Sequence, residues 1–433
     1  MNARERIVPT LVLALLQPCF ARGADAQAHD GMSTHTRPSR DSVSAMATAL
    51  VTRVAPAVNG RVRTDALVTQ PMIALRSVRA SSHLQVAAML NFEHLTMPDG
   101  EPVAGIWGEG FIDRRHPHTV VHEVMLTVNA ARGAVRTSIG AGRGFAPFGT
   151  DDPMVRPFTK FPANHHLAQV MERVQVVSAL RLSHVAALEA ALFNGDEPAS
   201  PTAAPQWTRF ADSHAARITI WPTRAVEVQG SMSWLRSPEF IRPDGLDHRK
   251  RSVSARVTPQ GRLLQYALVE WARTGEEYKG RPIIAYASTL AEASWRRMRW
   301  SVAVRGEQTT RPEDERLLEP FRISRPPNHL VIQGLTRWRI ATVHLARDVP
   351  VGPHVGAMIF GEVARAQSSP RLRPVLLDPR DISGADVAWH LTLGLRLSLG
   401  AMPARIGRYG AAAGGPATDR MLGMTHPTPA PDP

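Results

Sequence analysis

The sequence predicts an all-β protein, a transmembrane antiparallel up-and-down β-barrel of about 14–16 strands, with an even number favoured for a single chain. Polar and apolar residues alternate along many segments of about 9 to 11 residues, the length that a tilted strand needs to cross the hydrocarbon layer. After residue 28, no apolar run is long enough for a membrane-spanning helix. The chain has a single cysteine, close to its N-terminus.

The N-terminal region has the pattern of a secretory signal peptide. Arg4 and Arg6 precede a short apolar stretch, and Ala26-Gln27-Ala28 precedes the expected cleavage site. A lipoprotein signal ending at Cys19 is the less favoured alternative. Cleavage removes that cysteine, so the mature chain is expected to form no disulfide and no thiolate metal site. The expected organisation is a signal peptide (1–28), a flexible N-terminal segment (29–42), the barrel (43–402) and a disordered Pro/Gly-rich tail (403–433).

The formal net charge is +13, and nearly all of the positive charge is arginine, because only Lys160, Lys250 and Lys279 are lysines. The arginines are spread along the chain without a basic run that contains aromatic residues, so no nucleic-acid partner is predicted. A bias toward arginine codons is the favoured explanation. A surface or lumen that attracts anions is the alternative.

The alternation is clearest in two segments. In AVEVQGSMSW (225–234), valine, methionine and tryptophan occupy one side, and glutamate, glutamine and serine occupy the other. In LTLGLRLSL (391–399), five leucines share one side. Successive side chains of a strand point to opposite faces, whereas a helix would mix the two sets. A water-soluble β-sandwich would also alternate, so export and the absence of mature cysteines favour the membrane barrel.

Two further features agree with a barrel. Six tryptophans lie at or near the ends of expected strands, where interfacial girdles form: Trp221, Trp234, Trp271, Trp300, Trp338 and Trp389. Long connections alternate with short ones, as in barrels with short periplasmic turns and longer external loops. The long connections are expected at 95–117, 142–166, 194–213, 235–249, 309–327 and 365–386.

Several segments resemble porin-like outer-membrane β-barrel proteins of Gram-negative bacteria. They are FIDRRHPHTVVHEV (111–124, with a D-R-x-H-P-H pattern), NHH (164–166), LEAALFNGDEP (188–198) and SMSWLRSPE (231–239). The resemblance covers roughly residues 80 to 320, and it implies a barrel in the bacterial outer membrane without indicating a substrate. The chain departs from such barrels after Leu399, where further residues follow in place of a terminal aromatic residue.

Histidines gather in two of the long connections. His116 and His118 flank a proline, and His165 and His166 are adjacent. Neutral imidazoles suit Zn²⁺, Cu²⁺ or Ni²⁺, so these four residues are candidate ligands for a divalent metal. No regular metal-binding spacing is present, and a structural role for the loop is favoured. In the following strand, Glu123 is expected to face the lumen and His122 the outside.

The favoured function is a porin-like channel for small solutes with a mixed-charge lumen and a weak anion preference. The alternatives are an outer-membrane metal-linked binding or uptake protein that uses the loop histidines, and a soluble periplasmic β-protein that binds a ligand or partner. No catalytic residue is predicted, since no G-x-S-x-G or phosphate-loop motif is present, although an outer-membrane hydrolase stays open. The expected partners are outer-membrane lipid, the barrel-assembly machinery and small solutes, and the oligomeric state is left open. The residues expected to line the channel are Glu93, Glu123, Arg173, Gln175, Glu227, Gln229, Arg256, Glu270, Arg305, Glu307, Gln333, Arg337 and Arg396.

Overall fold

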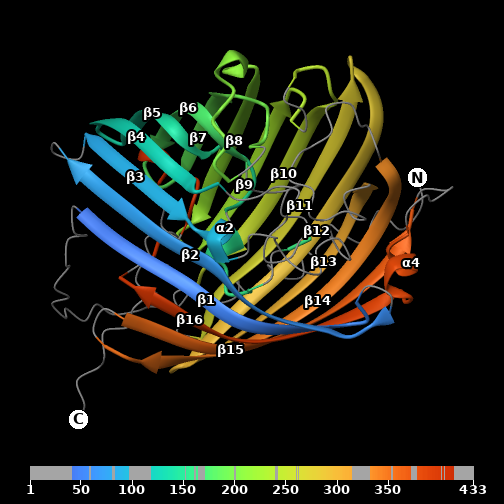
Figure 1. Ribbon diagram of the computed structural model, residues 1–433. Helices are drawn as coiled ribbons and strands as arrows, with labels where there is room; N and C mark the ends of the chain where they lie inside the picture. The colour runs from blue at the N-terminus through green and yellow to red at the C-terminus, as the bar shows by residue number, and fades with distance from the viewer. Residues whose placement is uncertain are drawn as a thin grey trace, which may run out of the picture. The chain divides into compact units, whose positions relative to one another are not determined.

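The described part of the chain forms sixteen strands in one closed antiparallel barrel (Figure 1). The strands are β1 (Asp41–Ala55), β2 (Arg63–Arg79), β3 (Leu84–Asn91), β4 (Val121–Arg132), β5 (Val135–Phe145), β6 (Glu172–Leu182), β7 (Ala186–Phe193), β8 (Ser213–Thr223), β9 (Val226–Leu235), β10 (Asp247–Val257), β11 (Leu264–Tyr278), β12 (Arg281–Arg297), β13 (Trp300–Asp314), β14 (Ile332–Pro350), β15 (Val355–Pro370) and β16 (Val387–Leu399). Each strand pairs with its neighbours in sequence, and β1 closes the ring on β16. The predicted fold class is confirmed.

The computed structural model describes residues 41–57, 60–79, 83–96, 119–151, 153–159, 162–163, 171–198, 201–238, 242–259, 261, 263–314, 332–352, 355–371, 378–400, 402–403 and 405–413. The short helices are α2 (Glu93–Thr96), α4 (Pro379–Ser383) and the 3-10 turns η4 (Pro153–Val155), η5 (Trp207–Arg209) and η7 (Gly410–Ala412). Within these residues, no helix combines the length and the apolar character needed to cross a membrane.

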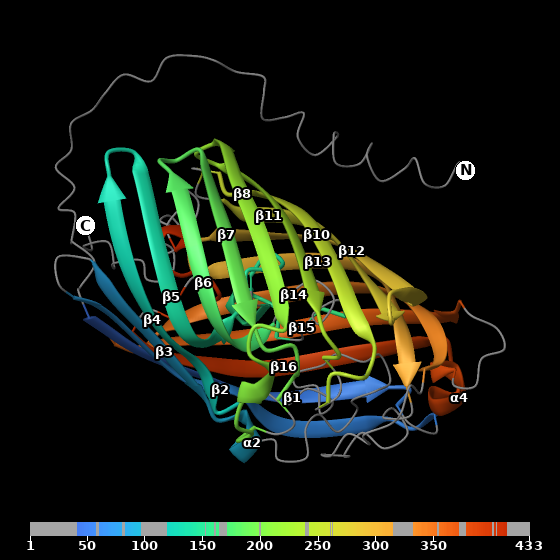
Figure 2. The same ribbon diagram turned by 90° about the horizontal axis from the view of Figure 1, so that it is seen from above.

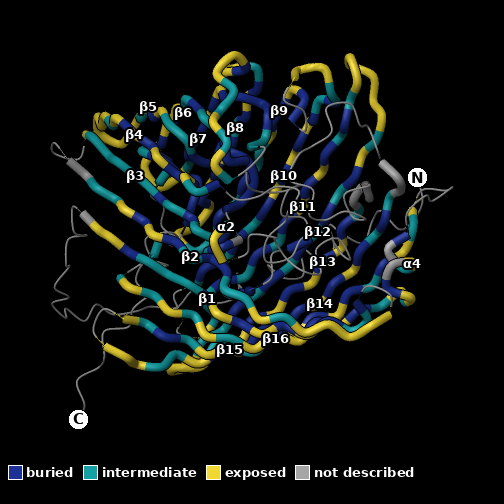
Figure 3. Tube along the Cα trace, viewed as in Figure 1, coloured by how far each residue is buried: buried dark blue, intermediate teal, exposed yellow. Residues whose placement is uncertain are grey.

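The alternation of the sequence becomes an inner and an outer face. Along β16, Leu393 is 63% exposed, whereas the adjacent Thr392 is 3% exposed. Buried and exposed positions alternate in the same way along β7, β10 and β14 (Figure 3). The outer positions are mainly leucine, isoleucine and valine, and many inner positions are charged or polar. Such a wall puts its apolar side chains outside the barrel, as a barrel in lipid requires.

The long connections all lie at one end of the barrel. Because the strands alternate in direction, every connection that follows an odd-numbered strand lies at one end of the barrel, here called the long-loop end. All six long connections of the expected pattern follow odd-numbered strands, and the other end, the short-turn end, has turns such as 133–134 and 183–185. The even strand count places Asp41 and Leu399 together at the short-turn end. In Figure 2, β1, β2 and β16 lie across the barrel from β7 to β10.

Two of the six tryptophans do not belong to an outer girdle. Trp221 and Trp338 are buried inside the barrel. Trp221 donates its indole N–H to Glu227 (3.0 Å), and Trp338 packs in a cluster with Ala163 and Ile340. By contrast, Trp389 is 50% exposed on the outer face. Strand parity, and not closeness to a strand end, decides which tryptophans reach the outside.

The expectation of a disordered tail from residue 403 is wrong for residues 405–413. These residues are described, and they are buried apart from the half-buried Gly410 and Ala413. Tyr409 accepts a hydrogen bond from the backbone N–H of Phe145 (2.9 Å), and Ala411 N–H donates to Ser138 Oγ (2.9 Å). The low apolar content of the tail suggested that it could not order itself. It is ordered by the barrel wall, which supplies the missing contacts.

Candidate functional site

Two segments occupy the interior of the barrel. The first, called the inner loop, is residues 146–151 and 153–159 of the connection between β5 and β6, and it enters from the long-loop end. The second, called the inner tail, is residues 405–413 after β16, and it enters from the short-turn end. The two segments contact each other inside the barrel, so parts of the chain that come from opposite ends narrow the interior.

Apolar contacts anchor the inner loop to several walls. Phe148 packs in a cluster with Phe193 of β7 and Leu235 of β9. Met154 packs with Met72 of β2 and with Ile406 of the inner tail. These contacts lie on well-separated strands of the ring, so the inner loop crosses the barrel instead of following one wall.

Glycine allows the inner tail to approach the wall closely. Gly410 has a φ of 54°, in the left-handed region that favours glycine. A Cβ at this position would lie 2.4 Å from Cβ of Ser138. The same wall residue accepts the N–H of Ala411. The turn η7 therefore fits against β5 only with glycine at its first position.

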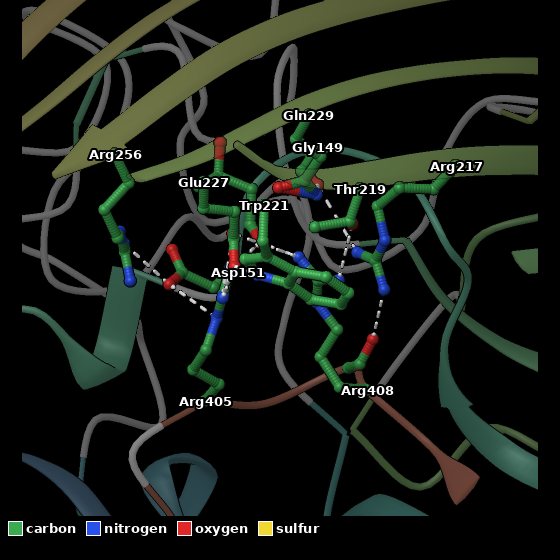
Figure 4. Close-up of polar contacts among 12 residues, drawn as sticks. Gly149, Asp151, Arg217, Thr219, Trp221, Glu227, Gln229, Arg256, Arg405 and Arg408 are labelled. Atoms are coloured by element: carbon green, nitrogen blue, oxygen red, sulfur yellow. Dashed lines mark hydrogen bonds and ion pairs between the residues drawn. The ribbon is translucent and has the colours of Figure 1, made fainter. Parts of the chain in front are cut away.

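Asp151 is the charge at which the two segments meet (Figure 4). Its carboxylate lies 2.8 Å from Arg256 of β10, 3.2 Å from Arg156 of the inner loop and 3.5 Å from Arg405 of the inner tail. Burial alone would raise the pKa of Asp151, but the guanidinium groups of Arg256, Arg156 and Arg405 outweigh it and hold the pKa well below its usual range. The carboxylate is therefore ionised at neutral pH.

Glu227, a wall residue on β9, binds the inner tail. Arg405 Nη1 donates to both carboxylate oxygens of Glu227, at 2.9 and 2.8 Å. Arg408 lies 3.7 Å from the same carboxylate. Arg405 and Arg408 also donate to the backbone carbonyl of Thr150 in the inner loop (3.1 and 3.4 Å). Each arginine thus joins the wall, the inner tail and the inner loop.

A second wall carboxylate, Glu189 of β7, completes the network. Arg217 of β8 makes a bidentate ion pair with Glu189 (2.7 and 2.6 Å). Arg217 also donates to the carbonyls of Gly149 (3.3 Å) and Gly407 (2.9 Å), one in each inner segment. Arg408 lies 3.4 Å from Glu189, and Figure 4 shows Arg408 beside Arg217. Burial, followed by the charges of Arg217 and Arg405, lowers the pKa of Arg408.

The far part of the inner loop is held by β11 to β15. Arg156 lies 3.5 Å from Glu292 and 3.7 Å from Glu270, and the Thr150 hydroxyl donates to Glu270. Burial would lower the pKa of Arg156, but Glu292, Asp151 and Glu270 raise it above its ordinary value. Beyond it, Glu362 accepts hydrogen bonds from the N–H of Thr159 (2.9 Å) and its hydroxyl (3.1 Å).

Most of the residues predicted to line a channel face the interior, and many of them contact the inner segments. Glu227, Gln229, Arg256 and Glu270 bind the inner loop or the inner tail. The Arg305 guanidinium lies 4.4 Å from the ring centre of Phe158, at the end of the inner loop, and Glu307 accepts the N–H of Ala163 (2.7 Å) in the connection beyond it. The remaining inward residues in the predicted set are Glu123, Arg173, Gln175 and Arg396.

Two predicted lining residues are placed differently. Arg337 is on the outer face of β14, because the inward positions of that strand are its even-numbered neighbours Thr336 and Trp338. Glu93 lies in α2, not on a strand, and it accepts hydrogen bonds from Thr69 Oγ1 (2.7 Å) and from the N–H of Gln70 (2.8 Å). That N–H belongs to a residue with a φ of 53° at a register shift in β2. Glu93 therefore stabilises an irregular strand. The side chain of Gln333 lies outside the described residues.

The expectation that His122 faces outward is wrong. His122 is fully buried, with Nδ1 2.9 Å from Glu172, and the adjacent Glu123 is buried as well. The register of β3 and β4 shifts between Glu123 and Val121, so an extra residue is inserted at His122. A bulge of this kind lets two consecutive side chains face the same side. The parity argument fails there because it assumes an unbroken ladder.

The histidine hypothesis is not tested by the structure. His116, His118, His165 and His166 lie outside the described residues. Among the residues that are described, no group of three or more histidine, cysteine, aspartate or glutamate side chains is arranged to hold a metal ion.

The sequence reasoning missed the inner segments. Arg217 and Glu189 could have been found by parity, since both lie on the polar face of a strand. Asp151, Arg405 and Arg408 lie outside the strands, where no periodic pattern exists. A signal in the tail is the segment RIGRY (405–409), in which Ile406 and Tyr409 are larger and more apolar than their immediate neighbours.

The barrel is similar to solved outer-membrane proteins. The anion-selective porin from Comamonas acidovorans aligns with a TM-score of 0.51 and 8% identity, over 83% of this chain and 99% of that chain. The outer-membrane channel DcaP of Acinetobacter baumannii aligns with a TM-score of 0.51 and 8% identity, over 83% and 96%. OprB of Pseudomonas putida aligns with a TM-score of 0.50 and 9% identity, over 83% and 94%. At these identities the likeness shows a common fold, a closed barrel of the kind found in outer-membrane porins.

No protein-family profile matches the sequence, and no curated protein sequence matches it either.

Proposed function

We propose that this protein is a porin-like channel of the bacterial outer membrane that passes small solutes and is narrowed by the inner loop and the inner tail. The observation that carries the proposal is the two-faced wall: a closed barrel with apolar residues outside and charged residues inside. A water-soluble barrel would place its apolar residues inside. The wall therefore favours a membrane barrel over a soluble periplasmic β-protein.

The outer face fits the thickness of a membrane. On β14, the outward residues Ala341, Val343 and Leu345 lie between Arg339 and Arg347. The eight residue steps from Arg339 to Arg347 span about 27 Å along a strand, and less along the membrane normal because barrel strands tilt. An apolar band of about 25 Å is typical of outer-membrane barrels. Lipid is thus the proposed surrounding of this face, and insertion by the barrel-assembly machinery is part of the proposal.

The interior supports a weak ion preference. Five arginines of the inner network stand against five carboxylates, so the two signs balance. They are Arg156, Arg217, Arg256, Arg405 and Arg408 against Asp151, Glu189, Glu227, Glu270 and Glu292. We assign the weak anion preference to the arginine excess of the chain and to further inward arginines such as Arg396, whose Nε donates to Thr48 Oγ1 (3.2 Å). A pore selects by the charges along its path and by its width.

The function is proposed as transport without catalysis. The buried acids of the interior are engaged by arginines or by backbone N–H groups, as Glu189 and Glu362 illustrate. A general acid or base needs a site where a substrate can reach it. These carboxylates instead hold the inner segments in place.

The test is electrical recording from the refolded mature chain in planar lipid bilayers. We expect discrete conductance steps and a reversal potential that leans modestly toward anions in a salt gradient. The same preparation should change its gel mobility on boiling in detergent, because a closed barrel resists unfolding. A chain that stays dissolved and monodisperse in detergent-free buffer, or a folded barrel that never conducts, would overturn the proposal.

A further inference from the structure

Four arginines form a row on the outer face of β14 and β15 at the long-loop end. They are Arg371, Arg337, Arg339 and Arg365, and they are called the arginine row here. Arg337 and Arg339 are two residues apart on one strand and therefore share a face. In the register of β14 and β15, Arg339 is opposite Gln367, and Arg365 is opposite Ala341, so Arg339 and Arg365 are diagonal neighbours.

The fourth member extends the row toward the loops. The N–H of Arg371 donates to the carbonyl of Leu335 (2.6 Å), which places Arg371 diagonal to Arg337. Neighbours on one face of a sheet are about 5 to 8 Å apart. The four guanidinium groups can therefore reach a common ligand.

The row has little compensating negative charge. Within the described residues, no member of the row forms an ion pair, and Arg339 donates from Nε only to the neutral Gln308 (3.3 Å). Asp386 lies beside the row, where it accepts a hydrogen bond from the neutral Gln367 (3.4 Å). Like charges on adjacent strands destabilise a sheet. An anion bound across the row would remove that repulsion.

The row lies just beyond the apolar band. Arg365 is opposite Trp389 of β16, whose ring is exposed on the outer face. One step further along the same face, Val343 is opposite Val363, and Val363 is opposite Leu391. An exposed tryptophan next to an apolar band marks the headgroup level of a membrane. The ligand available to the row at that level is a lipid headgroup.

We propose that the arginine row is a binding site for a lipid whose headgroup carries more than one phosphate, of the bisphosphorylated glycolipid kind. The inference rests on the proposed membrane location. Arginine binds phosphate in a bidentate manner, and a row of four spans more than one phosphate group. Because the row lies at the long-loop end, the lipid belongs to the leaflet that the long loops face.

The opposite edge of the same wall supplies a matched control. At the short-turn end, the Arg347 guanidinium of β14 lies 5.3 Å from the ring centre of Trp300 of β13, and Arg297 of β12 is opposite Trp300. These two arginines are also exposed on the outer face, but they are not part of the row. Arg297→Gln/Arg347→Gln therefore removes charge from the wall without touching the proposed site.

The experiment is native mass spectrometry of the full-length mature barrel in detergent, titrated with bisphosphorylated lipid A, phosphatidylglycerol or phosphatidylcholine. We expect the wild type to bind bisphosphorylated lipid A most tightly. Arg337→Gln/Arg339→Gln/Arg365→Gln should weaken that binding by about tenfold or more, because each arginine close to an anionic lipid surface adds to the binding free energy. The control variant should bind as the wild type does.

Three outcomes separate the hypotheses. Equal binding of phosphatidylglycerol and lipid A, or unchanged binding in the triple variant, overturns the proposed site while leaving the channel intact. Each variant is first checked for a closed barrel by its heat-dependent gel mobility, and a variant that fails this check is replaced by the three single Arg→Gln variants. A wild-type chain that forms no barrel in detergent overturns the proposed function itself.

Discussion

Asp151 shows at the scale of one residue how the interior is held. Its carboxylate faces Arg256, Arg156 and Arg405, each from a different segment. Burying two charges is costly, and the cost is offset only when the geometry and the further hydrogen bonds are good. Removing one member leaves the others buried without compensation, so the network depends on each of its carboxylates.

Asp151→Asn should therefore lower the stability of the folded barrel. Breaking a buried ion pair from one side typically costs about 3–5 kcal/mol. The measurement is the midpoint of the heat-induced mobility change, compared with Asp244→Asn, whose side chain is exposed in a turn. Equal midpoints for the two variants would contradict the role of Asp151.

The same carboxylate predicts a dependence on pH. Its pKa is depressed in the folded chain below the unfolded value of about 3.9, so its contribution is fully present above that value. The contribution is lost as the pH falls through the unfolded value toward the lower, folded one. The stability difference between the wild type and Asp151→Asn should therefore be largest near neutral pH and should shrink in acid. A difference that grows on acidification would show the opposite sign.

Single residues were predictable from the sequence only where strand parity applied. The inward direction of Glu227, Gln229 and Arg256 follows from alternation alone, and the structure places them there. The same rule applies to Arg337, but the inward positions of β14 are the even-numbered ones, so the prediction that Arg337 faces inward is wrong by one residue. Asp151 and Arg405 lie in irregular segments, whose positions depend on contacts with distant strands, as with Arg256 and Glu227.

At the scale of elements, we expect removal of the inner tail to change the conductance and the ion selectivity of the pore. A chain that ends at Pro403 lacks Arg405 and Arg408, and the carboxylates of Glu227 and Glu189 then lose positive partners. We expect a larger conductance and a reversal potential shifted toward cations. Planar-bilayer recording of the shortened chain checks both quantities.

Two comparisons keep that prediction specific. A chain that ends at Ala413 retains the inner tail and should conduct as the full chain does. Arg405→Gln/Arg408→Gln retains the segment but not its charge, so selectivity should move toward cations with a smaller change of conductance. If both shortened chains behave alike, the inner tail does not narrow the pore.

Regular elements were predicted better than irregular ones for a physical reason. A strand in a two-faced wall repeats every two residues, and that period is visible in the sequence of β9 and β16. A bulge such as the one at His122 breaks the period by a single residue. The inner tail has no period, and its order comes from the walls of β4 to β9, which the local sequence does not describe.

At the scale of the whole molecule, the apolar band makes a depth-dependent prediction. Leu393 is 63% exposed in the middle of the outer face of β16, and Leu399 is 51% exposed at its end. An arginine on the lipid face costs about 2–4 kcal/mol at the midplane and about 0–1 near the interface. Leu393→Arg should therefore destabilise the barrel in lipid vesicles far more than Leu399→Arg.

The readout is the denaturant midpoint of vesicle-inserted protein, followed by tryptophan fluorescence. In a water-soluble barrel both leucines would face solvent, and the two variants would differ little. Equal midpoints would thus argue against the membrane location.

The closed ring and the strand number within the predicted range were available from the sequence, because they depend on a pattern repeated along the chain. The filling of the lumen was not.

The inner tail directly follows β16, so we expect it to enter the lumen only when the barrel closes. Because β16 is the strand that joins β1, we expect the seam and the filling of the lumen to be completed together. Until that moment Glu227 and Glu189 face an open, hydrated interior, which an ionised carboxylate tolerates well. The arrival of Arg405 and Arg408 then gives these carboxylates positive partners and narrows the passage through the barrel.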